Sequence, residues 1–240
     1  MIEIKNVSLS YVKNQKVIDD IKFEVEDGTV FGFIGPNGAG KTTTIEMITG
    51  VLNIDEGDIL TDGKSITKNP LEAKKQFGFV PDTPDVFEKL TGIEYLNFIG
   101  DIYDVPSEVR LKKVKELAEV FGISKHLKDR IQSYSHGMRQ KLLIISVLLH
   151  NPKNWILDEP MTGLDPKASY TLKQLMKEHA KKGNTVFFST HVLEVSEKLC
   201  DKIAVIDKGK IIFVGTCEEI KEKSKTNSSL EESFLKIIEG

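Results

Sequence analysis

The feature that most constrains this chain is a glycine-rich segment between an apolar run and a pattern that can continue as a helix. The segment reads Gly35-Pro36-Asn37-Gly38-Ala39-Gly40-Lys41-Thr42-Thr43. It follows the apolar residues 30–34 and leads into residues 44–48. Glycines let the backbone turn tightly, with positive φ where needed, so that several N–H groups converge on one anion. This strand–loop–helix context predicts a phosphate-binding P-loop.

Two side chains after the glycines match the chemistry of a bound nucleotide. Lys41 is placed to reach the outer phosphates as a point charge, and the Thr42 hydroxyl can ligate Mg²⁺. The N-terminus of the following helix adds partial positive charge. The bare pattern arises by chance in a chain of this length roughly once in a hundred cases. The flanking strand and helix lower those odds further, so we expect nucleotide binding.

The bulk composition fits a soluble globular protein and argues against several other classes. Lys and Arg total 33 against 36 Asp and Glu, and this net charge of −3 gives no general attraction for nucleic acid or anionic lipid. The apolar runs are shorter than the ~20 residues that span a bilayer, and the first residues carry no signal-peptide core. With 2 cysteines there is no disulfide framework and no metal-ligand spacing, so we expect a reducing, cytosolic setting.

Strand and helix patterns alternate along the chain. Strand signals occur within residues 2–34 and at residues 77–80, 155–157, 185–188 and 203–206. Residues 83–150 instead show helical spacing. Apolar strands alternating with helices predict a mainly parallel α/β core. We expect a single domain over residues 1–240, divided into a core (1–82 and 151–215), a helical part (83–150) and a C-terminal tail (216–240).

A second element of a phosphate site follows the apolar run at residues 155–157, which ends in Asp158 and Glu159. In P-loop enzymes an acidic residue at such a strand end helps to hold Mg²⁺, and Asp158 fits that role. Glu159 comes next, near where a water would attack the γ-phosphate, and is the candidate general base. The alternative is an acidic pair in an exposed turn, which the P-loop upstream makes the weaker interpretation.

Four further residues stand where a nucleotide site could use them. Ser135 precedes a nearly all-apolar helix pattern and can cap it, and Gly137 leaves backbone N–H groups open to an anion. His191 follows the strand signal, which places its imidazole on the expected catalytic edge. Tyr11 falls in a loop-like stretch, where a tyrosine taken alone is more often a packing residue than a ligand contact.

Together these elements resemble the motifs of the ATP-binding-cassette (ABC) ATPase family, over essentially the whole chain from Tyr11 to Gly215. The motifs occur in the family's order. They are Tyr11 as the aromatic A-loop, Gly35–Thr43 as Walker A, Tyr134–Gln140 as the signature, Trp155–Glu159 as Walker B, Gly163–Asp165 as the D-loop and His191 as the switch histidine. The resemblance implies an α/β P-loop NTPase core with an N-terminal antiparallel β subdomain and an inserted α-helical subdomain.

The resemblance also implies roles for the residues. Two ATPase domains pair head to tail around two ATP molecules, so that each P-loop faces Ser135 and Gly137 of its partner, and Tyr11 stacks on adenine. The implied catalytic residues are Lys41, Glu159 and His191, and the implied Mg²⁺ ligands are Thr42, Asp158 and Asp82. The implied ATP-binding residues are Tyr11, Gly35, Pro36, Asn37, Gly38, Ala39, Gly40, Lys41, Thr42, Thr43, Ser135 and Gly137.

Two positions depart from the family pattern. Where the family usually has a glutamine after the strand at residues 77–80, this chain has Asp82. An aspartate there either binds Mg²⁺ directly or, if too short, reaches it through water. The common Ser-Gly-Gly-Gln signature appears as Ser-His-Gly-Met at residues 135–138, followed by Arg-Gln. With its acidic residue at the glutamine position and its Gly-Met-Arg-Gln ending, the chain resembles the ATPase subunits of bacterial ABC exporters for drugs, antibiotics and similar compounds.

The leading hypothesis is an ATP-hydrolysing subunit that powers transport, and specifically export, through a separate integral membrane protein. It would lie in the cytoplasm, peripheral to the inner face of the cell membrane, and pair with a second, identical or different, ATPase subunit. Residues 82–104 are the expected docking region for the membrane subunit. The alternatives are a soluble ABC ATPase acting on ribosomes or DNA, which the charge balance does not support, and a regulatory module that binds nucleotide without hydrolysis. The transported compound stays open, because the membrane subunit selects it in this family.

Overall fold

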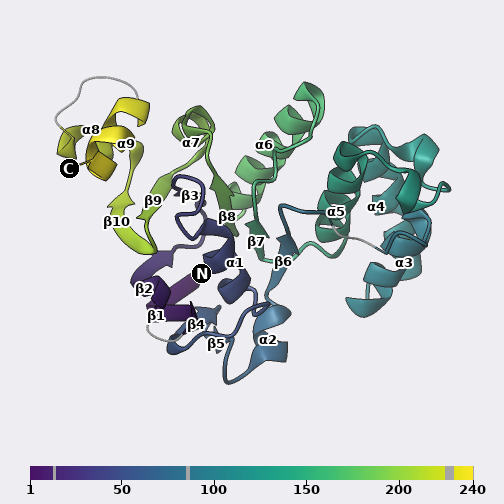
Figure 1. The fold of residues 1–240 in the computed structure, drawn as a ribbon. Helices are drawn as coiled ribbons and strands as arrows, with labels where there is room; N and C mark the ends of the chain where they lie inside the picture. Colours follow the sequence, from purple (N-terminus) through teal and green to yellow (C-terminus); the bar gives the residue numbers. More distant parts are fainter. Residues whose placement is uncertain (13–14, 85–86, 225–229, 240) are drawn as a thin grey trace.

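In the part of the chain that the structure describes, a six-stranded sheet in the order β10-β9-β3-β8-β7-β6 lies at the centre of the fold. The structure is a computed structural model that describes residues 1–12, 15–84, 87–224 and 230–239. The strands of this sheet are β3 (Val30–Ile34), β6 (Phe77–Val80), β7 (Asn154–Leu157), β8 (Thr185–Thr190), β9 (Lys202–Asp207) and β10 (Lys210–Gly215) (Figure 1). Neighbouring strands are parallel except for β10, which is antiparallel to β9. β3, β7 and β8 are buried along their whole length, which explains their almost continuously apolar sequences.

A second, antiparallel sheet in the order β2-β1-β4-β5 covers one face of the central sheet. Its strands are β1 (Ile2–Val12), β2 (Gln15–Val25), β4 (Glu56–Thr61) and β5 (Lys64–Ser65), and helix α1 (Lys41–Ile48) shares their core. Phe23 of β2 stacks on Phe31 of β3 and on Phe187 of β8, with ring centroids 5.9 Å and 6.2 Å apart. Aromatic packing therefore joins the two sheets.

Helices cover the opposite face of the central sheet. α5 (His136–His150) and α6 (Pro166–Lys181) share one core with apolar residues of β7 and β8. α5 buries most of its length because its sequence is apolar on nearly every side after the first turn. Two shorter helices, α2 (Pro70–Lys74) and α7 (Leu193–Leu199), follow β5 and β8 in the chain.

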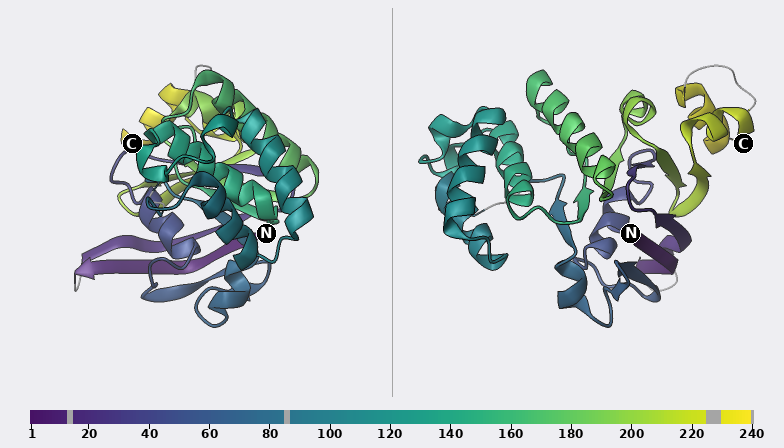
Figure 2. Two further views of the ribbon diagram at one scale, coloured as in Figure 1. Left: turned by 90° about the vertical axis from the view of Figure 1, so that its right-hand side faces the viewer. Right: turned by 180° about the vertical axis from the view of Figure 1, so that it is seen from behind.

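Helices α3 (Gly92–Ile102), α4 (Ser107–Val120) and α5 gather at one end of the molecule, beside the edge strand β6 (Figures 1 and 2). Short 3₁₀ turns at Ser124–His126 and Ile131–Ser133 connect α4 to α5. The sequence predicts helical character from residue 83 onward, but the first helix that the structure describes in this region, α3, begins at Gly92. Its start is fixed there because Thr91 and Glu94 form a capping box.

Helices α8 (Cys217–Lys223) and α9 (Leu230–Glu239) lie at the opposite end of the molecule (Figure 1). Their apolar residues pack with those of β9 and β10. Residues 225–229 and 240 of the expected C-terminal tail lie outside the described residues. Within the ranges that the structure describes, we find no helix with the length and apolar character of a membrane span.

The architecture confirms the expected α/β fold, with an antiparallel N-terminal sheet and a group of helices between β6 and β7. The expectation for Tyr11 was wrong in one respect. Tyr11 lies within β1 and not in a loop-like stretch, because β1 stays paired with β2 as far as Val12 and Gln15. Lys13 and Asn14, the rest of that stretch, lie outside the described residues.

Candidate functional site

The residues with candidate catalytic roles follow the carboxyl ends of adjacent parallel strands. β3 leads into the glycine-rich loop, β8 into His191, β7 into Asp158 and Glu159, and β6 towards Asp82. The last residues of β3 and β8 are paired, as are the last residues of β6 and β7, and β8 extends two residues beyond its pairing with the end of β7. Ligands of parallel α/β sheets bind at this edge. The topology therefore brings together segments that are distant in the sequence.

The glycines of the loop over residues 35–43 are required for two different reasons, a positive φ angle and a lack of space for a side chain. Gly38 and Gly40 have positive φ angles of 79° and 111°, which favour glycine. Gly35 has no positive φ, but a Cβ at this position would collide with the carbonyl oxygen of Ile206 in β9. α1 begins directly after Gly40, so the positive end of its dipole lies at the loop. This is the backbone conformation of an anion-binding loop.

The turn between β9 and β10 supports the glycine-rich loop through backbone hydrogen bonds. The Gly209 N–H donates to the carbonyl oxygen of Ala39, and the Gly209 carbonyl accepts from the N–H of Asp19 in β2, both at 2.9 Å. A Cβ on Gly209 would collide with the backbone of Val17. The sequence predicts a turn at Lys208 and Gly209, but not this contact, because its partners are distant in the chain.

The Lys41 ammonium lies inside its own loop. It donates to the carbonyl oxygens of Gly35 at 2.8 Å and Pro36 at 3.2 Å, and the residue is 7% exposed. Burial lowers the pKa of Lys41, and nearby carboxylates, that of Glu159 foremost, act in the opposite direction. Anionic phosphate oxygens bind an ammonium more strongly than neutral carbonyls do. Lys41 is therefore placed to pass its hydrogen bonds to a bound phosphate.

Asp158 is buried between two hydroxyl groups. The Ser189 hydroxyl donates to Asp158 Oδ1 at 2.5 Å, and the Thr42 hydroxyl lies near enough to favour the charged form of the carboxyl group. Burial raises the pKa of Asp158, the hydroxyls oppose this rise, and the carboxylates of Asp82 and Glu159 add to it. A buried carboxylate beside other carboxylates is a group that a divalent cation stabilises.

Glu159 and His191 form a pair at the same edge. His191 Nδ1 lies 2.9 Å from Glu159 Oε1, and the Glu159 side chain is 14% exposed. The backbone N–H of Glu159 donates to Ser189 Oγ at 2.9 Å. The φ angle of Glu159 is 45°, a left-handed conformation that costs a non-glycine residue about 1–3 kcal/mol. Neighbouring groups must therefore hold this residue in place.

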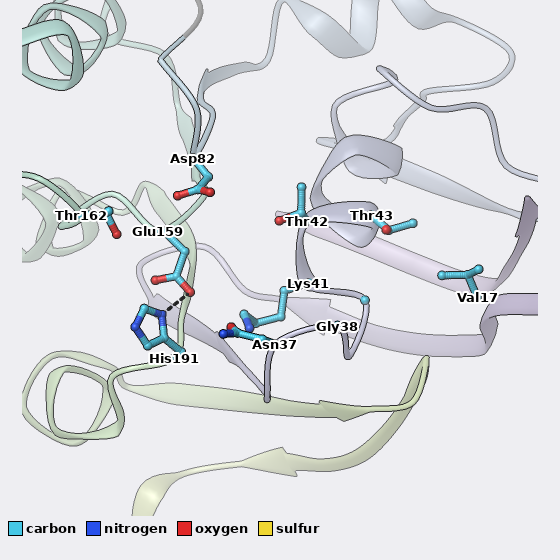
Figure 3. A pocket seen from close by; sticks show the side chains of 11 residues that line it. Val17, Asn37, Gly38, Lys41, Thr42, Thr43, Asp82, Glu159, Thr162 and His191 are labelled. Carbon is cyan, nitrogen blue, oxygen red and sulfur yellow. Dashed lines mark hydrogen bonds and ion pairs between the residues drawn. The ribbon is translucent and has the colours of Figure 1, made fainter. Parts of the chain in front are cut away.

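A pocket of about 340 Å³ lies between these groups. Figure 3 shows Asp82, Glu159 and His191 along one side of it, with Lys41 and Thr42 across from them. The predicted residues that line the pocket are Asn37, Gly38, Gly40, Lys41, Thr42, Thr43, Asp82, Glu159 and His191. The structure thus gathers the P-loop, the candidate base and the switch histidine around one space.

The match between the predicted residues and the pocket lining is not complete. The predicted residues outside the lining are Tyr11, Gly35, Pro36, Ala39, Ser135, Gly137 and Asp158. Val17 and Thr162 line the pocket but were not predicted. Val17 could not be singled out from the sequence, because it is one of several apolar residues in an alternating strand. Thr162 belongs to no sequence motif, although its position three residues after Glu159 was a signal that it could line the same pocket.

Tyr11 stands beside the P-loop. Its side chain is 58% exposed, and its hydroxyl lies 3.4 Å from Thr43 Oγ1. An exposed aromatic ring next to a phosphate-binding loop has a free face for stacking on a planar base.

Ser135 and Gly137 form the start of α5, away from the pocket. The Ser135 hydroxyl caps the helix by accepting a backbone N–H at 3.3 Å, and Ser135 itself is exposed. A Cβ on Gly137 would collide with the carbonyl oxygen of Gly163. Lys141 and Asp165 form an ion pair at 2.5 Å. The signature and D-loop segments therefore pack against each other within one chain.

Comparison with known proteins decides the family. The family model described as ABC transporter matches residues 18–162, a span that includes the P-loop, the signature segment and Glu159. The chain belongs to the ABC transporter family. It is one of the ATP-binding subunits of that family, and its enzymatic activity is ATP hydrolysis.

Individual ABC proteins are similar to the chain along nearly its whole length. The linearmycin resistance ATP-binding protein LnrL of Bacillus subtilis (strain 168) is 34% identical over 245 residues, which cover 99% of this chain and 78% of LnrL. A solved ATP-binding subunit of an ABC transporter is 32% identical, with a TM-score of 0.93 and 99% of both chains covered. Another, cbiO1 of Clostridium perfringens, described as part of the ABC transporter complex cbiONQ, is 26% identical, with a TM-score of 0.76 and coverage of 92% and 90%.

Proposed function

We propose that this ABC ATPase hydrolyses ATP with Glu159 as the general base and thereby powers export through a separate membrane subunit. The observation that carries the proposal is the pair of Glu159 and His191, which lies across the pocket from Lys41 and Thr42 (Figure 3). A water in line with the γ-phosphate would approach from the side of the pocket opposite the P-loop. A carboxylate on that side is in position to take its proton.

The remaining residues bind and orient the nucleotide. The backbone of residues 35–43 surrounds the phosphates, and Lys41 holds the outer ones. His191 contacts the γ-phosphate while its Nδ1 side orients Glu159. Tyr11 stacks on the adenine, a contact that contributes about 1–3 kcal/mol per base in other proteins.

The side chains at the pocket fit Mg²⁺ as the cofactor. Thr42 lines the pocket and the buried Asp158 lies close to it, and both offer the oxygen ligands that this ion prefers. In the part of the chain that the structure describes, no three His, Cys, Asp or Glu side chains form a metal site of their own. Mg²⁺ is typically held by one or two carboxylates together with substrate phosphates, so this is the expected donor set. When bound, Mg²⁺ neutralises negative charge on the phosphates.

Asp82 adds a third carboxylate to this edge, where the family usually has a glutamine. Asp82→Asn is expected to raise the free Mg²⁺ concentration for half-maximal ATPase activity by about 10-fold, because loss of a group that orients a metal typically weakens metal affinity by 10- to 100-fold. Activity titrated against free Mg²⁺ measures this. Asp129→Asn is the control, because Asp129 pairs with His126 away from the pocket. An unchanged Mg²⁺ dependence in Asp82→Asn would show that Asp82 does not act on the ion.

Pairing with a second ATPase subunit explains why the signature residues lie outside the pocket. Ser135 is exposed at the N-terminus of the 15-residue helix α5, where the helix dipole favours an anion. Neither Ser135 nor Gly137 lines the pocket of its own chain. In the proposed dimer, both residues contact the γ-phosphate of the ATP that the partner's P-loop holds.

The helical part at residues 83–150 provides the docking surface for the membrane subunit. Phe87 and Phe98 are 59% and 42% exposed, and their rings pack edge to face at 5.5 Å. Tyr95, which the sequence also placed in this region, is 6% exposed and belongs to the core. Residues 85 and 86 of the region lie outside the described residues.

Residues 1–82 and 151–215 form the catalytic part, and the subunit lies in the cytoplasm at the inner face of the membrane.

Co-purification from membranes tests the transport proposal. The tagged chain should be recovered with an integral membrane protein identified by mass spectrometry, and Phe87→Ser with Phe98→Ser should weaken that association without lowering the ATPase activity of the isolated chain. Recovery with ribosomes or DNA instead would contradict the proposal and favour a soluble ABC ATPase. The name of LnrL, a relative linked to linearmycin resistance, supports export as the direction.

A further inference from the structure

Ser189 is a buried residue that none of the family motifs includes. It is the second-last residue of β8, it is 0% exposed, and it pairs with Phe33 of β3. β8 lies between β3 and β7, so Ser189 stands between the strand that leads into the P-loop and the strand that leads into Asp158 and Glu159.

The Ser189 hydroxyl joins the two acidic residues of Walker B. It donates to Asp158 Oδ1 at 2.5 Å and accepts the backbone N–H of Glu159 at 2.9 Å. A serine hydroxyl has one hydrogen to donate and lone pairs to accept. Because Asp158 takes the hydrogen, the bond from Glu159 uses a lone pair, and both bonds can exist together.

The backbone of Glu159 needs such a partner. Its φ of 45° is a conformation that side chains other than glycine rarely adopt. The next residue is Pro160, which further restricts the backbone of the residue before it. Strained residues persist where their surroundings over-determine them. The bond to Ser189 fixes the Glu159 N–H, and the bond to His191 fixes the carboxylate, so the residue is held at both ends.

We propose that Ser189 is a positioning residue, whose hydroxyl holds the Glu159 backbone so that the carboxylate keeps the angle needed for water attack, and holds Asp158 towards the proposed Mg²⁺ site. This inference rests on the proposed roles of Glu159 and Asp158. Ser189 does not line the pocket, so its effect would pass through the two bonds.

The matched control is another buried serine. Ser146 of α5 is 5% exposed, and its hydroxyl donates to the Leu143 carbonyl of its own helix at 2.7 Å. Ser146→Ala makes the same chemical change in the protein interior, away from the pocket. The melting temperatures of the two alanine variants are compared with that of the parent. They show how much of any loss of activity is due to lower stability of the fold.

Ser189→Ala is expected to lower kcat by about 10- to 100-fold, because loss of a group that orients catalytic residues has effects of this size. At Mg²⁺ concentrations that saturate the site, the KM for ATP should stay within about twofold of the parent, since the remaining loss acts in the transition state. Ser189→Cys has nearly the same shape but is a weak donor, so it should be as slow as alanine. Ser189→Thr keeps the hydroxyl on a residue type that suits strands, and it should retain most of the activity.

A second readout does not depend on turnover. Binding of a fluorescent N-methylanthraniloyl ATP analogue in EDTA should be the same for Ser189→Ala and the parent, because the P-loop is intact. Mg²⁺ is then titrated into the analogue complex, and the Mg²⁺ concentration that gives half of the fluorescence change should be about 10-fold higher for Ser189→Ala than for the parent. The proposal is overturned if Ser189→Ala keeps the parental kcat, if cysteine restores it, or if metal-free binding falls in parallel with kcat.

The same experiments separate this inference from the proposed function. If Glu159→Gln abolishes hydrolysis while Ser189→Ala turns over normally, Glu159 is the base but Ser189 does not position it. If Glu159→Gln hydrolyses ATP at the parental rate, the proposed mechanism fails, and the inference fails with it.

Discussion

Glu159→Gln is expected to lower kcat for ATP hydrolysis by about 10²- to 10⁴-fold, the usual contribution of a general base. Glutamine has nearly the same shape as glutamate, but it cannot accept a proton from the attacking water. Its carbonyl oxygen can still accept a hydrogen bond from His191, so the pocket should keep its form. The proposed phosphate contacts come from the loop at residues 35–43, which this change leaves intact, so affinity for Mg²⁺-ATP should be retained.

Phosphate release and nucleotide binding, measured on the same preparation, test this expectation. Glu194→Gln is the control, because Glu194 is an exposed carboxylate on the neighbouring helix α7 and does not line the ATP pocket. The control should hydrolyse ATP at the parental rate. A Glu159→Gln protein with full activity would show that another group activates the water, and loss of ATP binding would show that Glu159 shapes the pocket instead.

Lys41→Ala is expected to weaken ATP binding by about 10- to 150-fold, and hydrolysis at subsaturating ATP should fall at least as much. Hydrogen bonds that involve a charged group contribute about 1.5–3 kcal/mol each, which corresponds to this range. The ammonium at present bonds to the carbonyls of Gly35 and Pro36. Its removal therefore also leaves the Gly35 carbonyl oxygen without its donor, while the Pro36 carbonyl still accepts the N–H of Ala39.

Equilibrium binding of ATP and ADP distinguishes these two effects of Lys41→Ala. If the lysine contacts the outer phosphates, affinity for ATP should fall more than affinity for ADP. An equal loss for both nucleotides would indicate a general distortion of the loop. Lys177→Ala is the control, because Lys177 is an exposed lysine that bonds the Lys198 carbonyl outside the pocket. Unchanged ATP affinity in Lys41→Ala would contradict the assignment of the phosphate site.

The sequence predicts best those features whose chemistry depends on residues close together in the chain. The P-loop requires Gly38, Gly40, Lys41 and Thr42 at fixed spacing, and the structure gives the two glycines the positive φ that this spacing implies. The buried strands are also predictable, because strands covered on both faces are apolar throughout. The position of Glu159 beside the pocket follows, since it comes directly after one of these strands.

Features that depend on distant contacts could not be predicted in this way. Gly209 gives no local sign that it braces Ala39, and Gly35 requires glycine only because β9 passes close to it. Ser189 is one small polar residue in an apolar strand, and its two bonds arise only once β7 and β8 are paired. Tyr11 could not be assigned to β1 because extension of that strand depends on its pairing with β2.

In the proposed dimer, two copies of this subunit enclose ATP between the P-loop of one and the Ser135 helix of the other. Light scattering on Glu159→Gln during size-exclusion chromatography tests it most directly, because slow hydrolysis preserves the ATP-bound state. With Mg²⁺-ATP the mass should be twice that of one chain, and Ser135→Ala in the same background should weaken the dimer while Ser133→Ala should not. A protein that binds ATP with full occupancy and stays monomeric, or a dimer that forms equally well without ATP, would contradict this ATP-bound dimer.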